Sequence, residues 1–521
     1  MQPTPLPAPF GGIKDDVPII SLQAPYCENL LNFNIVQEGV VLRKGDTRYN
    51  FVSAPVSFAQ TDRLGLAKYG ESNLFGYILD DNGSLMSFLD IDAGTIVHTI
   101  AGTANAYFYP LYFNNYLFFL NPTDYNPGVY YNGTVWGNIG YTGSGFQPIG
   151  GCVYKNRAYI VQYQDASYWY SNIDAITGAL TKVDLNSITL EKCSLTSICT
   201  VTLADTVSAV SLLAFVFSNG EVLFYSGSYP NSADWRLEGK AKIAQPIFYN
   251  SFIPYQGDSL IICDSGLVSL RDLFLKGSEQ AASLTVSSNI ETTWREMVAE
   301  IRRIRSTPTG PLTQTIRGVW DPANLRIILT SPYYLDSNGT ANAGAFYFIL
   351  DTDLESWSFH RSFGSVSGGL GICDIINYKN KIYYTVTCGG SAFIVYQKEG
   401  GTGFTDKNSA NSDVAYDYEI KSGPVSVERA WVQLFCGMDV IVKSDLHAQT
   451  NYEFIRDFGV QTTTAQKVNA VSGSLQKPFV NAGIEGSYIQ YKISGTTTTG
   501  KTVGYQLYGT NMWSSQGTSP R

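Results

Sequence analysis

The sequence predicts an all-β fold, mainly antiparallel, in which a β-propeller with a small helical insertion is followed by an additional β region at the C-terminus. Only 15% of the 521 residues are charged, against about 25% in an average protein. The chain contains 49 glycines and 35 tyrosines, and these residue types favour turns and strands respectively. Short apolar runs joined by tight turn signals recur along the chain, as in the blades of a propeller.

The clearest of these runs lie between residues 211 and 273. The apolar segments 211–218 and 221–226 flank Asn219-Gly220, a dipeptide typical of a type I′ hairpin turn, in which both central residues have positive φ. Both segments are apolar on both faces, so we expect them to lie between other sheets. The same pattern continues in residues 251–255, 259–263 and 267–270.

Further hairpins are predicted where paired runs flank Asn82-Gly83, Asn114-Asn115, Asn132-Gly133, Lys155-Asn156 and Lys379-Asn380. The Asn-Gly turns at Asn82, Asn132, Asn219 and Asn338 are separated by roughly one or two blades of about 40 to 45 residues, if one insertion is allowed. The repeat is structural, with little sequence identity between its units.

The insertion is predicted to be helical. Ser288 and Glu291 form a capping-box pattern, and an apolar stripe at helical spacing includes Trp294 and Ile301. Pro308 and Gly310 are expected to end the helix. Its apolar face packs either on its own domain or on a neighbouring subunit, and the sequence leaves both alternatives open.

The N-terminal residues are rich in proline and precede Gly11-Gly12, which favours an extended arm on its own surface or on a neighbour's, or a disordered tail. The glycine- and threonine-rich segment 400–411 is the expected boundary before the last region. The predicted organisation is an arm and entering strand (1–50), the first part of the propeller (51–274), the helical insertion (275–312), the rest of the propeller (313–411), and a C-terminal β domain or propeller-closing strands (412–521).

No catalytic, cofactor-binding or metal-binding residues are predicted, and the chain is not expected to be an enzyme. The three histidines are far apart in sequence, and no Walker, G-x-S-x-G or G-x-G-x-x-G motif occurs. A sialidase-type Asp box is closest at residues 232–239, but Arg236 stands where that motif has glycine. The eight cysteines are scattered and are expected to be reduced structural thiols, with a Cys193–Cys199 link as a minor alternative.

The charge balance and hydropathy indicate a soluble protein made in a cytoplasm. The net charge is −9, and no basic cluster of the kind that binds nucleic acid is present. No segment approaches the ~18 consecutive apolar residues that would span a membrane, and no secretory signal is visible. Residues 101–150 hold 14 aromatic residues and one charged residue, Asp124, which indicates packing between blades or a carbohydrate-binding face.

Two stretches resemble the tail nozzle or tail-hub proteins of short-tailed bacteriophages (podoviruses). The first is FSNGEVLFYSGSYPNSADWRLEGKAKIAQPI with the later GDSLIICDSGLVSL, which is similar to the central part of those chains. The second, PAPFGGIKDDVPIISLQAPYCENLLNFNIVQEGVVLRKG, is similar to their opening arm. The resemblance covers roughly the first four fifths of the chain. Together with residues of the predicted hairpin and helix, this resemblance gives the candidate residues for fold and assembly. They are Gly11, Gly12, Asn29, Glu38, Gly39, Arg43, Lys44, Gly45, Asn219, Gly220, Trp294 and Ile301.

This resemblance implies a structural virion protein without a cofactor, located in the tail and assembled in the cytoplasm of the host bacterium. It implies a homo-oligomeric ring, hexameric as in that family, below the portal and adaptor and near the tail fibres. Such a ring retains packaged double-stranded DNA and then conducts it, without sequence specificity, during ejection. The alternatives are a receptor- or carbohydrate-binding tail protein and, more remotely, a propeller glycosidase.

Overall fold

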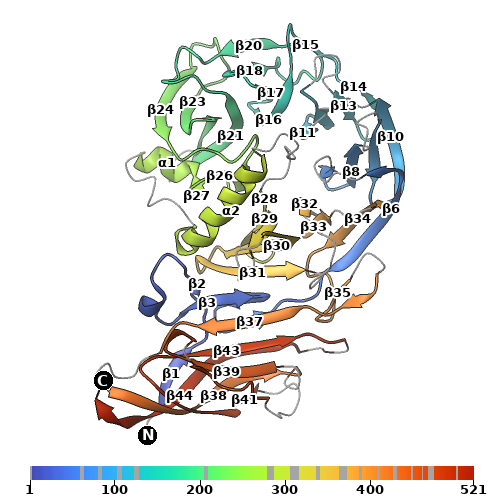
Figure 1. Cartoon of the computed structure of the whole chain (residues 1–521). Coiled ribbons are helices and arrows are strands. Elements are labelled where there is room, and N and C mark those ends of the chain that lie inside the picture. The colour runs from blue at the N-terminus through green and yellow to red at the C-terminus, as the bar shows by residue number, and fades with distance from the viewer. Residues whose placement is uncertain are drawn as a thin grey trace.

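The structure is a computed structural model, which describes residues 3–58, 64–79, 85–101, 108–122, 128–204, 209–277, 287–305, 316–335, 341–362, 372–386, 390–407, 411–425, 431–446, 450–459, 461–467, 475–499, 501 and 503–520. Within these residues the chain forms a β-propeller and a β region that packs beside it (Figure 1). The predicted all-β, mainly antiparallel fold is therefore confirmed.

Six four-stranded blades and one three-stranded sheet make up the described propeller, and adjacent sheets contact one another all the way around (Figure 1). The first blade contains β7 (Leu64–Tyr69), β8 (Asn73–Leu79), β9 (Leu85–Asp90) and β10 (Thr95–Ala101), and the second contains β11 (Tyr109–Phe113), β12 (Tyr116–Leu120), β13 (Gly128–Tyr131) and β14 (Trp136–Asn138). The third blade contains β16 (Pro148–Tyr154), β17 (Arg157–Gln162), β18 (Ser167–Tyr170) and β20 (Thr181–Asp184). The fourth contains β21 (Leu195–Ala204), β22 (Ala209–Phe217), β23 (Glu221–Ser226) and β24 (Arg236–Lys242). The three-stranded sheet and the next blade follow as β25 (Phe252–Tyr255), β26 (Asp258–Cys263) and β27 (Gly266–Ser269), then β28 (Arg317–Asp321), β29 (Arg326–Leu335), β30 (Ala341–Asp351) and β31 (Ser356–Ser362).

The last blade is closed by a strand from the start of the chain. Its strands β32 (Ile372–Tyr378), β33 (Lys381–Val386) and β34 (Gly390–Gln397) are joined at the outer edge by β6 (Thr47–Phe58). The expected boundary at residue 50 therefore falls inside a propeller strand. Residues 412–521 do not supply closing strands in the described part of the propeller, because β6 occupies that position.

The C-terminal β region is built jointly from both ends of the chain. One sheet contains β1 (Pro3–Pro7), β4 (Phe33–Val36), β5 (Gly39–Leu42), β38 (Trp431–Ser444), β41 (Leu475–Gln476), β42 (Phe479–Gly486) and β44 (Tyr505–Pro520). The blade β28–β31 extends into a second sheet through β3 (Tyr26–Leu31), β37 (Asp417–Ser422), β43 (Ile489–Thr496), β39 (Thr450–Arg456) and β40 (Gln461–Thr462), with β2 (Gly12–Ile13) on β3. The N-terminal arm thus lies on its own chain.

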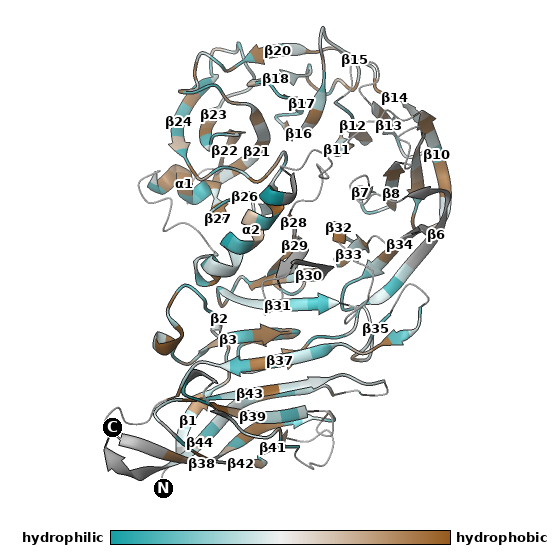
Figure 2. Ribbon diagram, viewed as in Figure 1, coloured by the Kyte–Doolittle hydropathy of each residue, from teal (hydrophilic) through white to brown (hydrophobic). Residues whose placement is uncertain are grey.

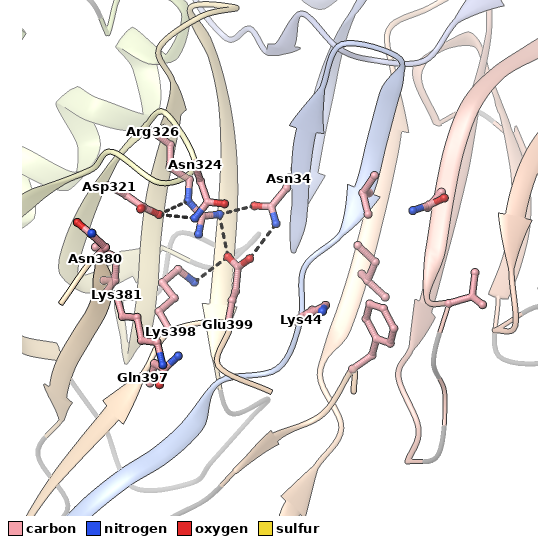
Figure 3. A pocket seen from close by; sticks show the side chains of 16 residues that line it. Asn34, Lys44, Asp321, Asn324, Arg326, Asn380, Lys381, Gln397, Lys398 and Glu399 are labelled. Carbon is pink, nitrogen blue, oxygen red and sulfur yellow. Dashed lines mark hydrogen bonds and ion pairs between the residues drawn. The ribbon is translucent and has the colours of Figure 1, made fainter. Parts of the chain in front are cut away.

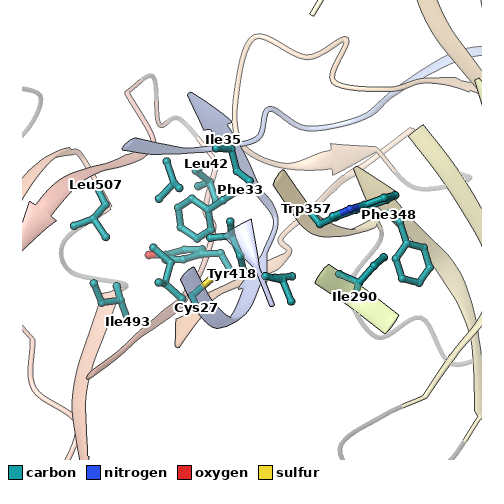
Figure 4. Packing of buried hydrophobic residues seen from close by; sticks show 14 of the residues in the cluster. Cys27, Phe33, Ile35, Leu42, Ile290, Phe348, Trp357, Tyr418, Ile493 and Leu507 are labelled. Carbon is teal, nitrogen blue, oxygen red and sulfur yellow. The ribbon is translucent and has the colours of Figure 1, made fainter. Parts of the chain in front are cut away.

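Alternating burial shows why these strands form layers. Along β37 and β43, buried residues repeatedly alternate with more exposed ones, and the hydropathy colours change accordingly in Figure 2. The buried face belongs to a large core that also includes Phe33 and Leu42 from the N-terminal strands and Trp357 from β31 (Figure 4). One core therefore joins the N-terminal arm, the blade and the C-terminal sheets.

The prolines of the arm protect a sheet edge. Strand β1 pairs with β44 in antiparallel register, and Pro3, Pro5 and Pro7 alternate with Thr4 and Leu6. Residues at alternate positions of a strand direct their backbone groups to the same side. The backbone groups of Thr4 and Leu6 therefore face β44, and those of the three prolines face the outer edge. The outer edge therefore offers no N–H donor from these prolines to another strand.

The hairpin at Asn219-Gly220 is confirmed, but its predicted type I′ turn is wrong. Gly220 has φ +85°, Asn219 does not have positive φ, and Phe217 and Glu221 flank a three-residue loop. The Gly220 N–H donates to Phe217 O at 2.9 Å, which fits a type I turn followed by a left-handed glycine. Paired positive φ values occur instead at Asn114-Asn115, Lys155-Asn156, Gln256-Gly257 and Lys379-Asn380. At Asn132-Gly133 only the glycine has positive φ, and Asn82 and Asn338 lie outside the described residues.

Within the described residues, two α-helices interrupt the propeller, and both depart from the prediction in detail. Helix α1 (Leu270–Lys276) begins where a strand was expected to end and is capped by Ser269, so the helical part starts before residue 275. Helix α2 (Glu291–Arg305) buries the predicted stripe, including Trp294 and Ile301, in the core of its own chain. The expected helix end at Pro308 and Gly310 lies outside the described residues.

The predicted Ser288–Glu291 capping box is replaced by a cap from the N-terminal arm. Ser288 begins a short 3-10 turn (Ser288–Ile290), and the carboxylate of Asp15 accepts hydrogen bonds from the backbone N–H groups of Thr292 and Thr293 at 3.0 and 2.8 Å. A carboxylate in this position also interacts favourably with the helix dipole. The arm thereby fastens α2 from 277 residues away.

We expect Asp15→Ala to lower the free energy of unfolding by about 1–2 kcal/mol, because it leaves two N–H groups of the first turn without their acceptor. Urea unfolding followed by circular dichroism measures this change. Asp16→Ala is the matched control, since Asp16 is exposed and its one ion pair among the described residues is with Lys14. Equal effects of the two substitutions would contradict the capping role of Asp15.

Candidate functional site

A dense set of buried charged side chains lies where the propeller meets the C-terminal β region. The segment that carries it, residues 43–46, links β5 in one sheet to β6 in the last blade. It contains three of the predicted candidates, Arg43, Lys44 and Gly45. We call the surrounding group the junction cluster; its members are Arg43, Asp46, Asp321, Arg326, His360, Lys398, Glu399 and Asp406.

Arg43 is the centre of the junction cluster, and its side chain is fully buried. Its guanidinium binds Asp406 through two parallel contacts of 2.9 and 2.8 Å, Nη1 to Oδ1 and Nη2 to Oδ2. The remaining N–H groups donate to Asn32 Oδ1 at 2.9 Å and to the backbone carbonyls of Lys44 and Arg361 at 2.9 and 3.0 Å. All five donors of this arginine are therefore satisfied, as a buried guanidinium requires.

Asp46 connects the same segment to the propeller. Its Oδ1 accepts the Glu399 N–H at 2.8 Å, and its Oδ2 accepts the Tyr384 hydroxyl at 2.7 Å and the Ser362 hydroxyl. Ser362 ends β31, Tyr384 lies within β33, and Glu399 follows β34. Asp46 thus holds the entering segment against two adjacent blades.

A second group of the junction cluster surrounds Arg326 (Figure 3). The Arg326 Nε donates to Asp321 Oδ2 at 2.9 Å, and its Nη1 lies 3.0 Å from Glu399 Oε1 and 2.9 Å from Asn34 Oδ1. Asn34 in turn donates to Glu399 Oε2 at 3.0 Å. Because Asn34 lies on β4 and Arg326 on β29, this group also ties the C-terminal β region to the propeller.

His360 and Lys398 complete the junction cluster in a buried environment. His360 Nε2 lies 3.1 Å from Phe33 O, so this nitrogen carries the proton, and Nδ1 accepts from Lys398 Nζ at 3.2 Å. Burial, together with the charges of Lys398, Arg43 and Arg326, lowers the pKa of His360 well below its usual value. The histidine is therefore neutral when the protein is folded near pH 7.

These contacts suit a structural role better than catalysis. For Arg43, burial alone would lower the pKa, but Asp406 and Asp46 raise it well above its usual value. The carboxylates of the cluster accept hydrogen bonds from fixed partners, and His360 is held by two neighbours. The junction cluster aligns residues 43–46 with both the propeller and the C-terminal β region.

His360 makes stability depend on pH. Its pKa is lower in the folded than in the unfolded chain, so below about pH 6.5 the unfolded chain binds more protons and stability falls. We expect a loss of up to about 1.4 kcal/mol per pH unit below about pH 6 from this residue. Denaturant unfolding at several pH values, with an NMR titration of the histidine ring protons, measures it. A His360 resonance that titrates near pH 6.5 in the folded protein would contradict this expectation.

A cavity of about 480 Å³ opens beside the junction cluster (Figure 3). One wall comes from the C-terminal β region, through Val41, Leu42 and Gln506, and the other from turns and strands of the propeller. Lys44 lies between the two walls. The further polar residues that line it are Asn34, Asp321, Asn324, Arg326, Asn380, Lys381, Gln397, Lys398 and Glu399.

The other predicted candidates lie in three parts of the chain: the N-terminal segment, the hairpin at residues 219–220 and helix α2. Gly11 and Gly12 pass close to Tyr26 and Trp357, Asn29 Nδ2 donates to Glu419 Oε1 at 2.9 Å, and Gly39 packs on the backbone of Leu507. Glu38 is exposed in the turn between β4 and β5. A Cβ on Gly45 would meet Thr405 O at 1.8 Å, so this close approach requires glycine. Asn219, Gly220, Trp294 and Ile301 lie outside the junction cluster.

The aromatic segment 101–150 is directed mostly inward in its described part. Tyr109, Phe113, Phe118 and Phe119 are buried, while Tyr112 is 42% exposed. Edge-to-face and stacked ring contacts join this blade to the preceding one, for example between Phe75 and Trp136 at 5.5 Å. This arrangement agrees with packing between blades.

Sequence reasoning missed most members of the junction cluster. Asp406 lies in the segment assigned as a linker, and His360 was treated as an isolated histidine. A signal was present at Lys398-Glu399, where two charged residues directly follow an apolar strand. A repeated pattern was also missed: Tyr-Lys-Asn followed by Arg or Lys occurs at residues 154–157 and 378–381, at equivalent hairpins.

Other types of site find no support among the described residues. No group of three or more potential metal ligands occurs there, and none of the helices there is long and apolar enough to cross a membrane. Cys193 and Cys199 are free thiols in this part of the chain, so the minor alternative of a link between them was wrong.

Comparison with known proteins assigns no family. No protein-family model and no curated protein matches the chain. Similar solved structures include Chaetomium thermophilum Raptor (8% identity, 68% of this chain and 29% of that chain, TM-score 0.37) and YCF48 bound to a D1 peptide (9%, 68% and 97%, 0.36). BamB from Moraxella catarrhalis is another (11%, 70% and 96%, 0.34). This chain spans less than a third of the length of Raptor.

At these identities and scores, the likenesses assign no activity to this chain. Its own sheets define the class: a β-propeller protein closed by an N-terminal strand and joined to a β region through a buried polar junction.

Proposed function

We propose that this protein is a structural component of the tail of a short-tailed bacteriophage, a nozzle or hub that forms an oligomeric ring below the portal and adaptor. The observation that carries the proposal is the resemblance of residues 7–45 to the opening arm of such proteins. In this chain these residues contribute β2, β3, β4 and β5, and they include Arg43 of the junction cluster near their end. The residues behind the resemblance therefore specify how the two halves of the molecule are joined.

In this role the protein acts mechanically and electrostatically. A hexameric ring retains the packaged genome and then provides a channel for it during ejection. The net charge of −9 favours passage over retention, because an acidic wall repels phosphate whereas lysine and arginine contacts hold DNA in place. The proposal places the protein in the virion tail, after assembly in the host cytoplasm, with no catalytic activity or cofactor.

The alternative is a receptor- or carbohydrate-binding tail protein, and its carbohydrate-binding form has less support. It requires an exposed aromatic face, and the described aromatic side chains of residues 108–146 are mainly buried between blades. In the described part of this segment, the exposed large hydrophobic side chains are those of Tyr112 (42%) and Val135 (57%). Isolated exposed residues of this kind are common on proteins and do not form a binding face.

Light scattering of the purified protein, alone and mixed with portal and adaptor proteins of a short-tailed phage, tests the proposal. The expected result is a particle of six times the 57.2 kDa chain mass, or formation of a stable complex with the adaptor. A monomer that joins neither partner at any ratio would contradict it. Binding to a glycan array by such a monomer would favour the alternative.

A further inference from the structure

The cavity beside the junction cluster contains two lysines without ion-pair partners among the described residues, Lys44 and Lys381. They approach from different sides: Lys44 follows β5, and Lys381 begins β33 at the tip of the last blade (Figure 3). Both are exposed to the cavity and to solvent. Two like charges that face one cavity repel each other unless an anion lies between them.

The other charges around the cavity are already matched. Arg326 lies within 3.0 Å of both Asp321 and Glu399, and Lys398 lies 3.8 Å from Glu399. These two cations and two anions balance, so Lys44 and Lys381 leave the lining with a net positive charge in a protein whose net charge is −9. The imbalance is local and opposite in sign to that of the whole chain.

The uncharged part of the lining supplies hydrogen-bond donors. Gln506 Oε1 accepts the Tyr508 hydroxyl at 3.0 Å, which leaves the Gln506 amide nitrogen available to donate. Asn380 and Gln397 add further amide groups on the propeller side. A volume of about 480 Å³ is within the usual range of small-molecule sites.

We propose that this cavity binds a phosphate-bearing ligand, with Lys44 and Lys381 as the two cations that hold it. Phosphate suits this pair of lysines, because lysine binds phosphate as a compact point charge, whereas the arginine of the lining, Arg326, is already engaged. Lysine ammonium groups that reach one cavity from two different elements suit a tetrahedral anion that accepts hydrogen bonds in several directions. The inference is independent of the proposed tail function.

Binding of this ligand would connect the two halves of the molecule. Lys44 and Gln506 belong to the C-terminal side of the junction, and Lys381 and Asn380 belong to the propeller. A phosphate group between them replaces charge repulsion with two attractive contacts across the boundary. Its source is either a small phosphorylated molecule or the backbone of a nucleic acid.

Isothermal titration of the full chain with sodium pyrophosphate tests the site, with a twelve-nucleotide single strand as a second probe. We expect saturable binding of pyrophosphate at one site per chain, and Kd about tenfold higher in both Lys44→Gln and Lys381→Gln. The control Lys192→Gln alters an exposed lysine in the connection between β20 and β21 and should leave Kd unchanged within twofold. Thermal unfolding shows whether each variant is folded.

The two probes separate the sources of phosphate. Pyrophosphate binding that both cavity variants weaken, without binding of the oligonucleotide, assigns the site to small molecules. Oligonucleotide binding that depends on both lysines assigns it to nucleic-acid phosphate. Absence of saturable binding of either probe to the unmodified chain up to about 1 mM, or binding that neither variant weakens, would overturn the proposal.

Discussion

Arg43→Met is expected to lower the free energy of unfolding by about 3–5 kcal/mol. The substitution preserves much of the side-chain volume but removes the guanidinium that binds both oxygens of Asp406, and it leaves Asp46 and Asn32 with fewer contacts. The buried carboxylates of Asp46 and Asp406 then lie close together without the guanidinium that contacted both. Urea unfolding, followed by tryptophan fluorescence, measures the change.

Two comparisons make this prediction specific. Arg295→Gln removes an arginine that is 72% exposed and pairs with Glu291 on the surface of α2, so it should change stability by about 0.5 kcal/mol or less. Arg43→Lys keeps the charge but loses the two-point contact with Asp406, and its effect should lie between those of the other two variants. An Arg43→Met protein as stable as the Arg295→Gln protein would contradict the structural role of the junction cluster.

Trp294→Ala is the second large expected effect, a loss of about 3–5 kcal/mol of unfolding free energy. Trp294 is fully buried, its ring lies beside that of Phe348, and its Nε1 donates to Cys263 O at 3.1 Å. Truncation removes a large apolar surface from the core that joins α2 to the blade, and leaves a cavity. Denaturant unfolding measures the loss.

The control for this prediction lies on the opposite face of the same helix. Glu296 is exposed, so Glu296→Ala should change stability by about 0.5 kcal/mol or less. Trp294→Phe keeps most of the apolar contact but leaves the Cys263 carbonyl without its donor, for an intermediate loss of about 1–2 kcal/mol. If Trp294→Ala left stability unchanged and altered only the oligomer mass, α2 would be a subunit interface rather than part of this chain's core.

Features set by neighbouring residues could be predicted from the sequence. The hairpins at Lys155-Asn156 and Lys379-Asn380, and the apolar stripe of α2, follow from local turn chemistry and helical spacing, and the structure has them. At Asn219-Gly220 the hairpin was predicted correctly but its loop was one residue longer, because glycine also satisfies a left-handed position after a type I turn.

Features that join distant segments could not be predicted in the same way. Arg43 and Asp406 are 363 residues apart, and the Asp15 cap of α2 replaces a local pattern at Ser288 that looked sufficient. Closure of the last blade by β6 likewise depends on a pairing between residues 47–58 and 390–397. Nothing in local composition identifies such partners, because each is selected by the packing of the finished fold.

The central claim, that this chain forms a ring that conducts DNA, is tested most directly by negative-stain electron microscopy of the purified protein, alone and with portal and adaptor. The account predicts closed rings of six copies around a channel wide enough for duplex DNA, stacked below the portal when all components are present. Isolated single propellers that never associate with the portal or adaptor would contradict it.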